Sequence, residues 1–220
     1  MLRFLGTAIL ITATLGFAQT VDSPHDGLVL GVVLDDKGMP VADATVFVGT
    51  IARGPSTHTD AEGKFVLGGI PPGVVGLHAY KKSDGYPYDI FAFFDMPGEK
   101  RPYFEVKEGK TTAGIVIQLG ARAAYLSLDI ADESGNPIET SLTLTRPDLG
   151  KYGDYKTSAG AHQTLMVPPV PFRLQVEADG FRPWHYGSDE WLTDKGLIKL
   201  NSGATLNLSI RLRPIKQTRK

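Results

Sequence analysis

The chain has 220 residues and a formal net charge of −1, from 23 lysines and arginines against 24 aspartates and glutamates. Nucleic-acid binding normally requires a clustered basic excess, so this composition predicts no nucleic-acid partner. The absence of cysteine excludes disulfides, lipid attachment to a cysteine, cysteine nucleophiles and thiolate zinc sites. The 25 glycines and 15 prolines favour short strands joined by many turns.

The N-terminal segment is typical of a secretory leader. A short basic start, Met1–Arg3, precedes an uncharged and mostly apolar run from Phe4 to Leu15, with small residues before Gln19. This run is shorter than the roughly 20 residues that span a bilayer. We therefore expect a signal peptide over residues 1–18, an exported chain in the periplasm or outside the cell, and no membrane span after leader cleavage. An uncleaved anchor is the alternative.

The rest of the chain contains one pattern twice. The stretch "LDDKGMPVADATVFV" (34–48) corresponds to "IADESGNPIETSLTLT" (130–145), and further glycines and prolines recur in the same order at a shift of 97 residues. We predict a duplication. The expected parts are an N-terminal linker at 19–25, a first domain at 26–119, a second domain at 120–214 and a basic C-terminal tail at 215–220.

Hydrophobic and polar residues alternate within each copy. In the stretch 205–212, Leu206, Leu208 and Ile210 alternate with polar residues, and 172–176 behaves in the same way. Such alternation predicts strands that bury one face, as in antiparallel sheets. Turn sequences such as Pro-Pro-Gly and Asp-Gly separate the strands. We predict an all-β chain of two tandem sandwiches.

The first copy resembles a carboxypeptidase regulatory-like domain, which is a transthyretin-like sandwich. The family's Gly-x-Val-x-Asp-x-x-Gly-x-Pro opening lies at Gly31–Pro40, its Thr-Asp-x-x-Gly-x-Phe hairpin at Thr59–Phe65, its Pro-Pro-Gly turn at Pro71–Gly73 and its Gly-Tyr pair at 85–86. Val75 departs from the pattern, which usually has an aromatic residue there. The resemblance implies seven-strand antiparallel Greek-key sandwiches that serve folding, binding or spacing and are generally not catalytic.

The second copy is a degenerate match. It keeps Gly135-Asn136-Pro137, the Pro168-Pro169 pair and Gly180-Phe181. It lacks the Asp-x-x-Gly-x-Phe signature and has "TSAGAHQTL" at 157–165 instead. Together the two copies cover nearly all of the expected mature chain.

The sequence contains no motif that carries known chemistry. The histidines, at positions 25, 58, 78, 162 and 185, are scattered singly, and no His-Glu-x-x-His or Gly-x-Ser-x-Gly motif occurs. The acidic turns "DAEG" and "DESG" could bind calcium weakly, although solvated tight turns are the favoured interpretation. We therefore predict no catalytic residue, no metal site and no cofactor.

Both copies carry aromatic residues in the connection that follows the Gly-Tyr or Gly-Phe pair. The first connection is rich in phenylalanine and tyrosine over 87–106, and the second contains "FRPWHYGSDEW" over 181–191. These residues either pack the sandwich and its neighbour or form an exposed patch for a glycan or protein partner. The candidate ligand-binding residues of the patch are Trp184, His185, Tyr186, Asp189, Glu190 and Trp191.

The predicted function is an exported, non-enzymatic binding or structural module. Two alternatives remain open at this point. One is a small metal-dependent hydrolase built on the sandwich loops, and the other is a pure structural spacer.

Overall fold

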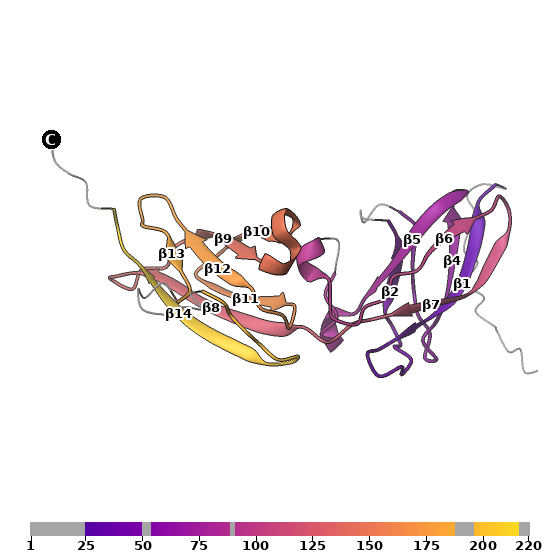
Figure 1. The fold of residues 1–220 in the computed structure, drawn as a ribbon, viewed down its shortest axis with the longest axis horizontal. Coiled ribbons are helices and arrows are strands. Elements are labelled where there is room, and N and C mark those ends of the chain that lie inside the picture. Colours follow the sequence, from indigo (N-terminus) through magenta and orange to yellow (C-terminus); the bar gives the residue numbers. More distant parts are fainter. Residues whose placement is uncertain (1–24, 50–53, 89–90, 188–195, 216–220) are drawn as a thin grey trace, which may run out of the picture.

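The computed structural model describes residues 25–49, 54–88, 91–187 and 196–215. These residues form two sandwich-like β domains that lie end to end along the long axis of the molecule (Figure 1). The signal peptide predicted at 1–18 lies outside the described residues. None of the helices in the described part of the chain is long and apolar enough to cross a membrane.

In the described part of the first domain there are seven strands and two short 3-10 helices. They are β1 (Gly27–Leu34), β2 (Thr45–Val48), β3 (Ser56–His58), β4 (Lys64–Ile70), β5 (Gly73–Tyr80), η1 (Lys82–Asp84), η2 (Ala92–Phe94), β6 (Tyr103–Val106) and β7 (Thr111–Gln118). One sheet has the strand order β4-β1-β7 and the other has the order β3-β2-β5-β6.

The second domain repeats this arrangement. Its elements are β8 (Ala124–Asp132), β9 (Thr140–Thr145), η3 (Pro147–Tyr152), β10 (Asp154–Ala159), β11 (His162–Val167), β12 (Arg173–Glu177), β13 (Trp184–His185) and β14 (Thr205–Leu212). The sheet orders β11-β8-β14 and β10-β9-β12-β13 match those of the first domain strand for strand. The predicted all-β fold with two tandem sandwiches is therefore confirmed.

One detail of the expected fold is wrong, because the sheets are not purely antiparallel. The last strand of each domain runs parallel to the first, β7 beside β1 and β14 beside β8. Both last strands follow a strand of the opposite sheet and cross over to the free edge of the first strand. The alternation of buried and exposed residues reports which face of a strand is buried and says nothing of the direction of its neighbour.

The Asp-x-x-Gly-x-Pro turn is the same in both copies. In the first, the Asp35 carboxylate accepts hydrogen bonds from the backbone amides of Lys37 and Met39 at 2.9 and 2.8 Å. In the second, the Asp132 carboxylate accepts from the amides of Ser134 and Asn136, both at 2.8 Å. The glycine that follows has a positive φ in each case, 79° at position 38 and 87° at position 135. A left-handed conformation of this kind favours glycine, which explains the repeated motif.

The two cores are filled differently at one matched position. In the first domain, Phe65 pairs with Gly31, and a Cβ at that glycine would lie 2.5 Å from the phenylalanine ring. The equivalent pair in the second domain is Gln163 and Leu128. The large buried side chain thus stands on the other strand of the pair in the second domain, where Leu128 occupies the position of Gly31.

The aromatic connection of the first domain bridges the two sandwiches. Tyr88 packs on Phe47, with ring centroids 5.1 Å apart, and so covers the outer face of the first domain's four-stranded sheet. A few residues later, Phe93 and Phe94 of η2 enter the hydrophobic core of the second domain, where Phe93 is 1% exposed. The turns of η2 and η3 lie side by side at the junction (Figure 1).

Arg146 of the second domain anchors this connection. Its buried guanidinium donates to the backbone carbonyl oxygens of Phe93 and Asp95 at 3.2 and 2.7 Å, and to the Asp148 carboxylate at 2.7 Å. Carbonyl groups that enter a core need such partners, because an unsatisfied buried polar group costs roughly 1–3 kcal/mol. The junction is therefore a packed and hydrogen-bonded interface.

Candidate functional site

The predicted aromatic patch begins on β13, where successive side chains point to opposite faces of the sheet. Trp184 pairs with the buried Val176 and packs, partly buried, against the core of the second domain. His185 pairs with Gln175 and is exposed on the outer face of the same sheet. The period of two therefore separates the tryptophan from the histidine.

Tyr186 lies on the same side of the strand as Trp184. Its backbone amide donates to the carbonyl oxygen of Leu174 at 3.0 Å, and its ring lies 6.5 Å from that of Trp184 at an angle of 69°. Both rings are partly buried against the core, so they contribute to packing. The other predicted patch residues, Asp189, Glu190 and Trp191, lie outside the described residues. Ligand binding by the patch stays a prediction.

A groove of about 410 Å³ runs along the outer face of the second domain's four-stranded sheet, beside β13. Among the residues that line it are Thr143, Thr145, Arg173, Gln175, His185 and Tyr186. Thr143, Gln175 and His185 form one cross-strand row, because the strand register places them directly opposite one another. This row offers hydroxyl, amide and imidazole groups, which suits a polar ligand bound by hydrogen bonds.

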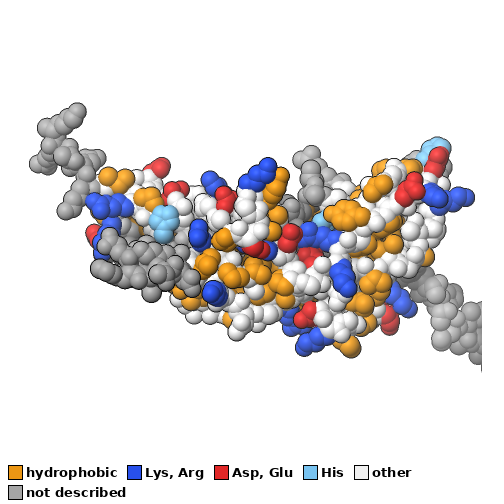
Figure 2. Space-filling view, in the orientation of Figure 1, with side chains coloured by type: hydrophobic (Ala, Val, Ile, Leu, Met, Phe, Trp, Pro, Cys, Tyr) orange, Lys and Arg blue, Asp and Glu red, His pale blue; other side chains and the backbone are white. Residues whose placement is uncertain are grey.

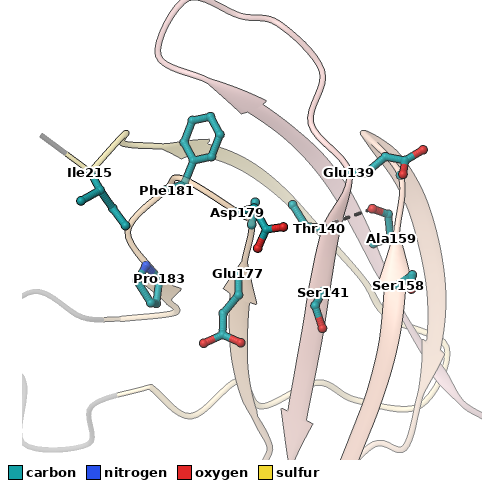
Figure 3. A pocket seen from close by; sticks show the side chains of 12 residues that line it. Glu139, Thr140, Ser141, Ser158, Ala159, Glu177, Asp179, Phe181, Pro183 and Ile215 are labelled. Carbon is teal, nitrogen blue, oxygen red and sulfur yellow. Dashed lines mark hydrogen bonds between the residues drawn. The ribbon is translucent and has the colours of Figure 1, made fainter. Parts of the chain in front are cut away.

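A larger hollow of about 740 Å³ lies at the end of the same sheet, shown in Figure 3. Three acidic residues border it, namely Glu139 before β9, Glu177 at the end of β12 and Asp179 just beyond that strand. Its apolar wall consists of Phe181, Pro183 and Ile215. Sequence reasoning missed this hollow because its lining comes from segments that are far apart in the chain. The stretch 181–191 of the sequence analysis contains two of its lining residues, Phe181 and Pro183.

The polar floor of this hollow is held by local hydrogen bonds. Thr140 donates to the carbonyl oxygen of Ala159 at 3.4 Å, which joins β9 to β10 (Figure 3). The Glu177 carboxylate accepts from the Gln175 side-chain amide at 2.7 Å. Because Gln175 also lines the groove beside β13, this contact connects the two depressions on one continuous sheet face.

A serine, a histidine and an aspartate meet on the outer face of the sheet β11-β8-β14. Asp129 on β8 accepts a hydrogen bond from Ser209 at 3.3 Å and lies 3.1 Å from His162. These two partners lie on the strands either side of β8, so about 10 Å of sheet separates them. A serine nucleophile must contact its histidine base directly, and this geometry therefore does not form a catalytic triad.

Arg211 completes this cluster as an ion-pair partner. Its guanidinium donates to the Asp129 carboxylate at 3.1 Å, and this hydrogen bond holds the pKa of Asp129 below its usual value. The arrangement is a surface ion pair across β8 and β14. Exposed pairs of this kind contribute little to stability.

The acidic turns use their carboxylates to hold the backbone. Asp60 accepts from the amides of Glu62 and Lys64 at 3.0 and 2.8 Å. In the second copy, the hydrogen bonds from Asn136 keep the pKa of Asp132 below its usual value. Within the described ranges, no group of three or more histidine, aspartate or glutamate side chains is placed to hold a metal ion.

Comparison with known proteins gives weak similarities. No protein-family model matches the chain, and no curated protein shows significant similarity to it. The Bacillus anthracis TIE protein is 14% identical with a TM-score of 0.33, over 87% of this chain and 34% of that one. A streptococcal ancillary pilin is 10% identical with a TM-score of 0.33, over 88% of this chain and 63% of that one.

The minor pilin of Streptococcus agalactiae is 9% identical with a TM-score of 0.38, over 89% of this chain and 98% of that one. The chain thus spans less than two thirds of the length of the first two proteins. These identities and TM-scores are too low to carry an argument about function.

Proposed function

We propose that the protein is an exported, non-enzymatic module whose two sandwiches form one rigid unit that presents the outer sheet face of the second domain for binding. The observation that carries this proposal is the junction. Phe93 and Phe94 from the first domain's connection are part of the second domain's core, and Arg146 hydrogen-bonds the backbone beside them. Domains joined only by an exposed linker would reorient freely.

Small-angle X-ray scattering tests the rigidity. We expect the wild-type chain to give one scattering profile that fits the two sandwiches end to end, unchanged between low and high salt because the contacts are buried. The double variant Phe93→Ala with Arg146→Ala, measured where tryptophan fluorescence shows the second domain still folded, should give a profile that requires several interdomain orientations. The matched control is Arg211→Ala, an exposed arginine remote from the junction, which should leave the profile unchanged. A wild-type profile that fits only a mixture of orientations would contradict the proposal.

The groove beside β13 supports a second candidate function, the binding of a glycan or a polar protein segment. Its row of Thr143, Gln175 and His185 offers hydrogen-bonding groups on one face of the sheet. The hydroxyl groups of sugars form hydrogen bonds with such side chains. We also propose that the chain belongs to the carboxypeptidase regulatory-like family and that it is exported to the periplasm or beyond. Three further residues of the predicted patch are proposed to take part in binding: Asp189, Glu190 and Trp191.

Titration of the isotope-labelled chain with neutral oligosaccharides tests this candidate. Saturable amide shifts at residues 143, 175 and 185–187 are expected, and His185→Ala should weaken them. Lys156→Ala is the control, because Lys156 pairs with Thr143 on the same face and does not line the groove. Shifts confined to another surface, or equal binding by His185→Ala, would remove the groove from the proposal.

A further inference from the structure

A second groove, of about 320 Å³, lies at the junction of the two domains and is lined by both. The first domain and its connection contribute Lys82, Tyr88 and Phe91, among others, and the second domain contributes Tyr155, Leu165 and Met166. The surface near this junction carries gathered hydrophobic side chains (Figure 2). No residue of this groove belongs to the patch predicted from the sequence.

The groove runs along the edge of a β-sheet. Three consecutive residues of β11, Thr164 to Met166, line it. Since successive residues of a strand face opposite ways, a groove that touches all three lies beside the strand's edge. In the described part of the chain, β11 pairs with β8 on one side and ends its sheet on the other. The outer edge of β11 therefore offers backbone donors and acceptors next to an apolar depression.

The residue of the first domain that corresponds to Leu165 is fully buried. Leu67 of β4 pairs with Val29 as Leu165 of β11 pairs with Leu126, and these partners are equivalent in the two copies. Leu67 is 1% exposed, whereas Leu165 is only partly buried. The second domain thus leaves Leu165 accessible at an edge where the first domain buries Leu67, although Val66 of β4 is 47% exposed.

The chemistry of the groove defines what it can accept. Phe91 is 50% exposed and its ring lies 5.4 Å from that of Tyr155, which gives the groove an aromatic wall. Phe93 and Phe94 extend this wall directly into the interdomain interface, so the groove continues a surface that already holds apolar residues from another segment. The exposed Lys82 at the groove adds a positive charge that complements an acidic residue.

We propose that this groove is a docking site for an extended peptide segment of a partner protein, which adds as a strand to the free edge of β11. Alternate side chains of the segment are apolar and enter the groove, and an acidic side chain pairs with Lys82. Strand addition of this kind takes its affinity from backbone hydrogen bonds and its specificity from pockets for alternate side chains. The inference extends the proposed binding module by naming a second surface and its class of partner.

The test uses the full chain and a blocked seven-residue peptide, acetyl-Asp-Thr-Val-Thr-Phe-Thr-Val-amide, in which the acidic and apolar side chains share one face. Amide shifts of the isotope-labelled protein should change saturably at residues 162–167, and amide exchange there should slow. A peptide with the same composition but with Val, Phe and Val adjacent should bind at least about tenfold more weakly, because its apolar side chains cannot all face the groove. N-methylation of the alternate peptide amides that face β11 should abolish binding, because it removes the donors of the backbone hydrogen bonds to that edge.

Two variants test whether the peptide binds at this groove, and a third serves as the control. Phe91→Ala should weaken the peptide about tenfold or more, because Phe91 is an exposed aromatic wall that the cores do not require. Lys82→Glu should weaken binding of the original peptide. A peptide with Lys in place of Asp should bind this variant as the original peptide binds the wild-type protein. The matched control is Tyr103→Ala, which removes an exposed aromatic side chain on β6 of the first domain.

Several outcomes would overturn the inference. These are no saturable binding by the alternating peptide, equal binding by Phe91→Ala, or shifts along a strand other than β11. Self-association of the chain through β11, seen by sedimentation and in competition with the peptide, would also overturn it. The occupant of the groove would then be a second copy of this chain and not a partner protein. None of these results bears on the scattering profile of the monomeric chain, which tests the rigid two-domain unit, so the two proposals fail separately.

Discussion

The two sandwiches share one strand order but differ in what completes their cores. The first domain fills its interior with its own side chains, including Phe65 packed over Gly31. The second domain includes Phe93 and Phe94, which belong to the connection between β5 and β6 of the first. The repeated strand order is therefore completed asymmetrically, since one domain supplies part of the other's core.

The two aromatic connections show the same asymmetry. The first crosses the junction, with Tyr88 on its own domain and Phe93 inside the next. In the second, Trp184 and Tyr186 stay on their own domain, partly buried at the sheet edge. Equivalent positions in a repeat therefore do not have equivalent roles, and the first connection is the one that determines how the domains are joined.

The largest expected effect on this comparison comes from Phe93→Ala. Removing a fully buried phenylalanine costs about 3–5 kcal/mol, and here the loss should fall on the second domain although the residue belongs to the first. Both tryptophans of the sequence lie in the second domain, so denaturation followed by tryptophan fluorescence reports that domain alone. Phe91→Ala is the control, with a cost of less than about 1 kcal/mol because the side chain is half exposed. Equal effects of the two changes would refute the shared core.

Arg146→Ala should have the next largest effect. It removes hydrogen bonds to the carbonyl oxygens of Phe93 and Asp95 and leaves them without these donors, at a cost of about 2–3 kcal/mol in the second domain's unfolding free energy. The same fluorescence-detected denaturation measures it. Arg211→Ala, an exposed ion-pair arginine of the same domain, should cost less than about 1 kcal/mol. If Arg146→Ala were equally mild, the guanidinium would not anchor the junction.

Gly31→Ala should sharpen the comparison of the two cores. A Cβ at this position would lie 2.3 Å from the carbonyl oxygen of Ile115 and 2.5 Å from the Phe65 ring, so the first domain should lose about 1–3 kcal/mol. Gly160→Ala in the second domain is the matched control, because its Cβ would meet nothing within 4 Å and its φ is not positive. Near-ultraviolet circular dichroism and hydrogen exchange separate the two domains. A tolerated Gly31→Ala would show that the strand pair relaxes easily.

The smallest expected effect concerns acid stability at the junction. The hydrogen bond from Arg146 lowers the pKa of Asp148 in the folded state from its ordinary value of 3.8. A lowered pKa stabilises the fold above the unfolded value, and this contribution is lost as the pH falls from about 3.8 through the folded value. The loss should be less than about 1 kcal/mol, because the Asp148 side chain is 55% exposed. Asp148→Asn should remove this part of the pH dependence, and an unchanged acid transition would contradict the pairing.

Local patterns in the sequence predicted local structure well. The alternation of residues gave the strands, and the Asp-x-x-Gly-x-Pro motif gave the same turn at Asp35 and Asp132. The parallel course of β7 and β14 was missed, because alternation carries no information on the direction of a neighbouring strand. The sequence also did not predict that Phe93 inserts into the second domain, because this contact depends on how the two domains meet.

The candidate sites likewise depend on contacts that local sequence patterns do not predict. The period of two, applied within "PWHY", would have separated Trp184 from His185, although only the structure identifies the face that is buried. The grooves themselves are formed by residues far apart in the chain, such as Thr143 with His185, or Phe91 with Leu165. Only the tertiary structure brings these residues together.

Residual dipolar couplings of the aligned full-length chain test the central claim most directly, namely that the first domain's connection fixes the second domain. Amides of residues 27–118 and 124–212 in regular strands should fit a single alignment tensor in the wild-type protein. Phe93→Ala with Arg146→Ala, measured where tryptophan fluorescence shows the second domain still folded, should separate them into two. Two different tensors in the wild-type chain would contradict the account, because the domains would then reorient despite the shared core.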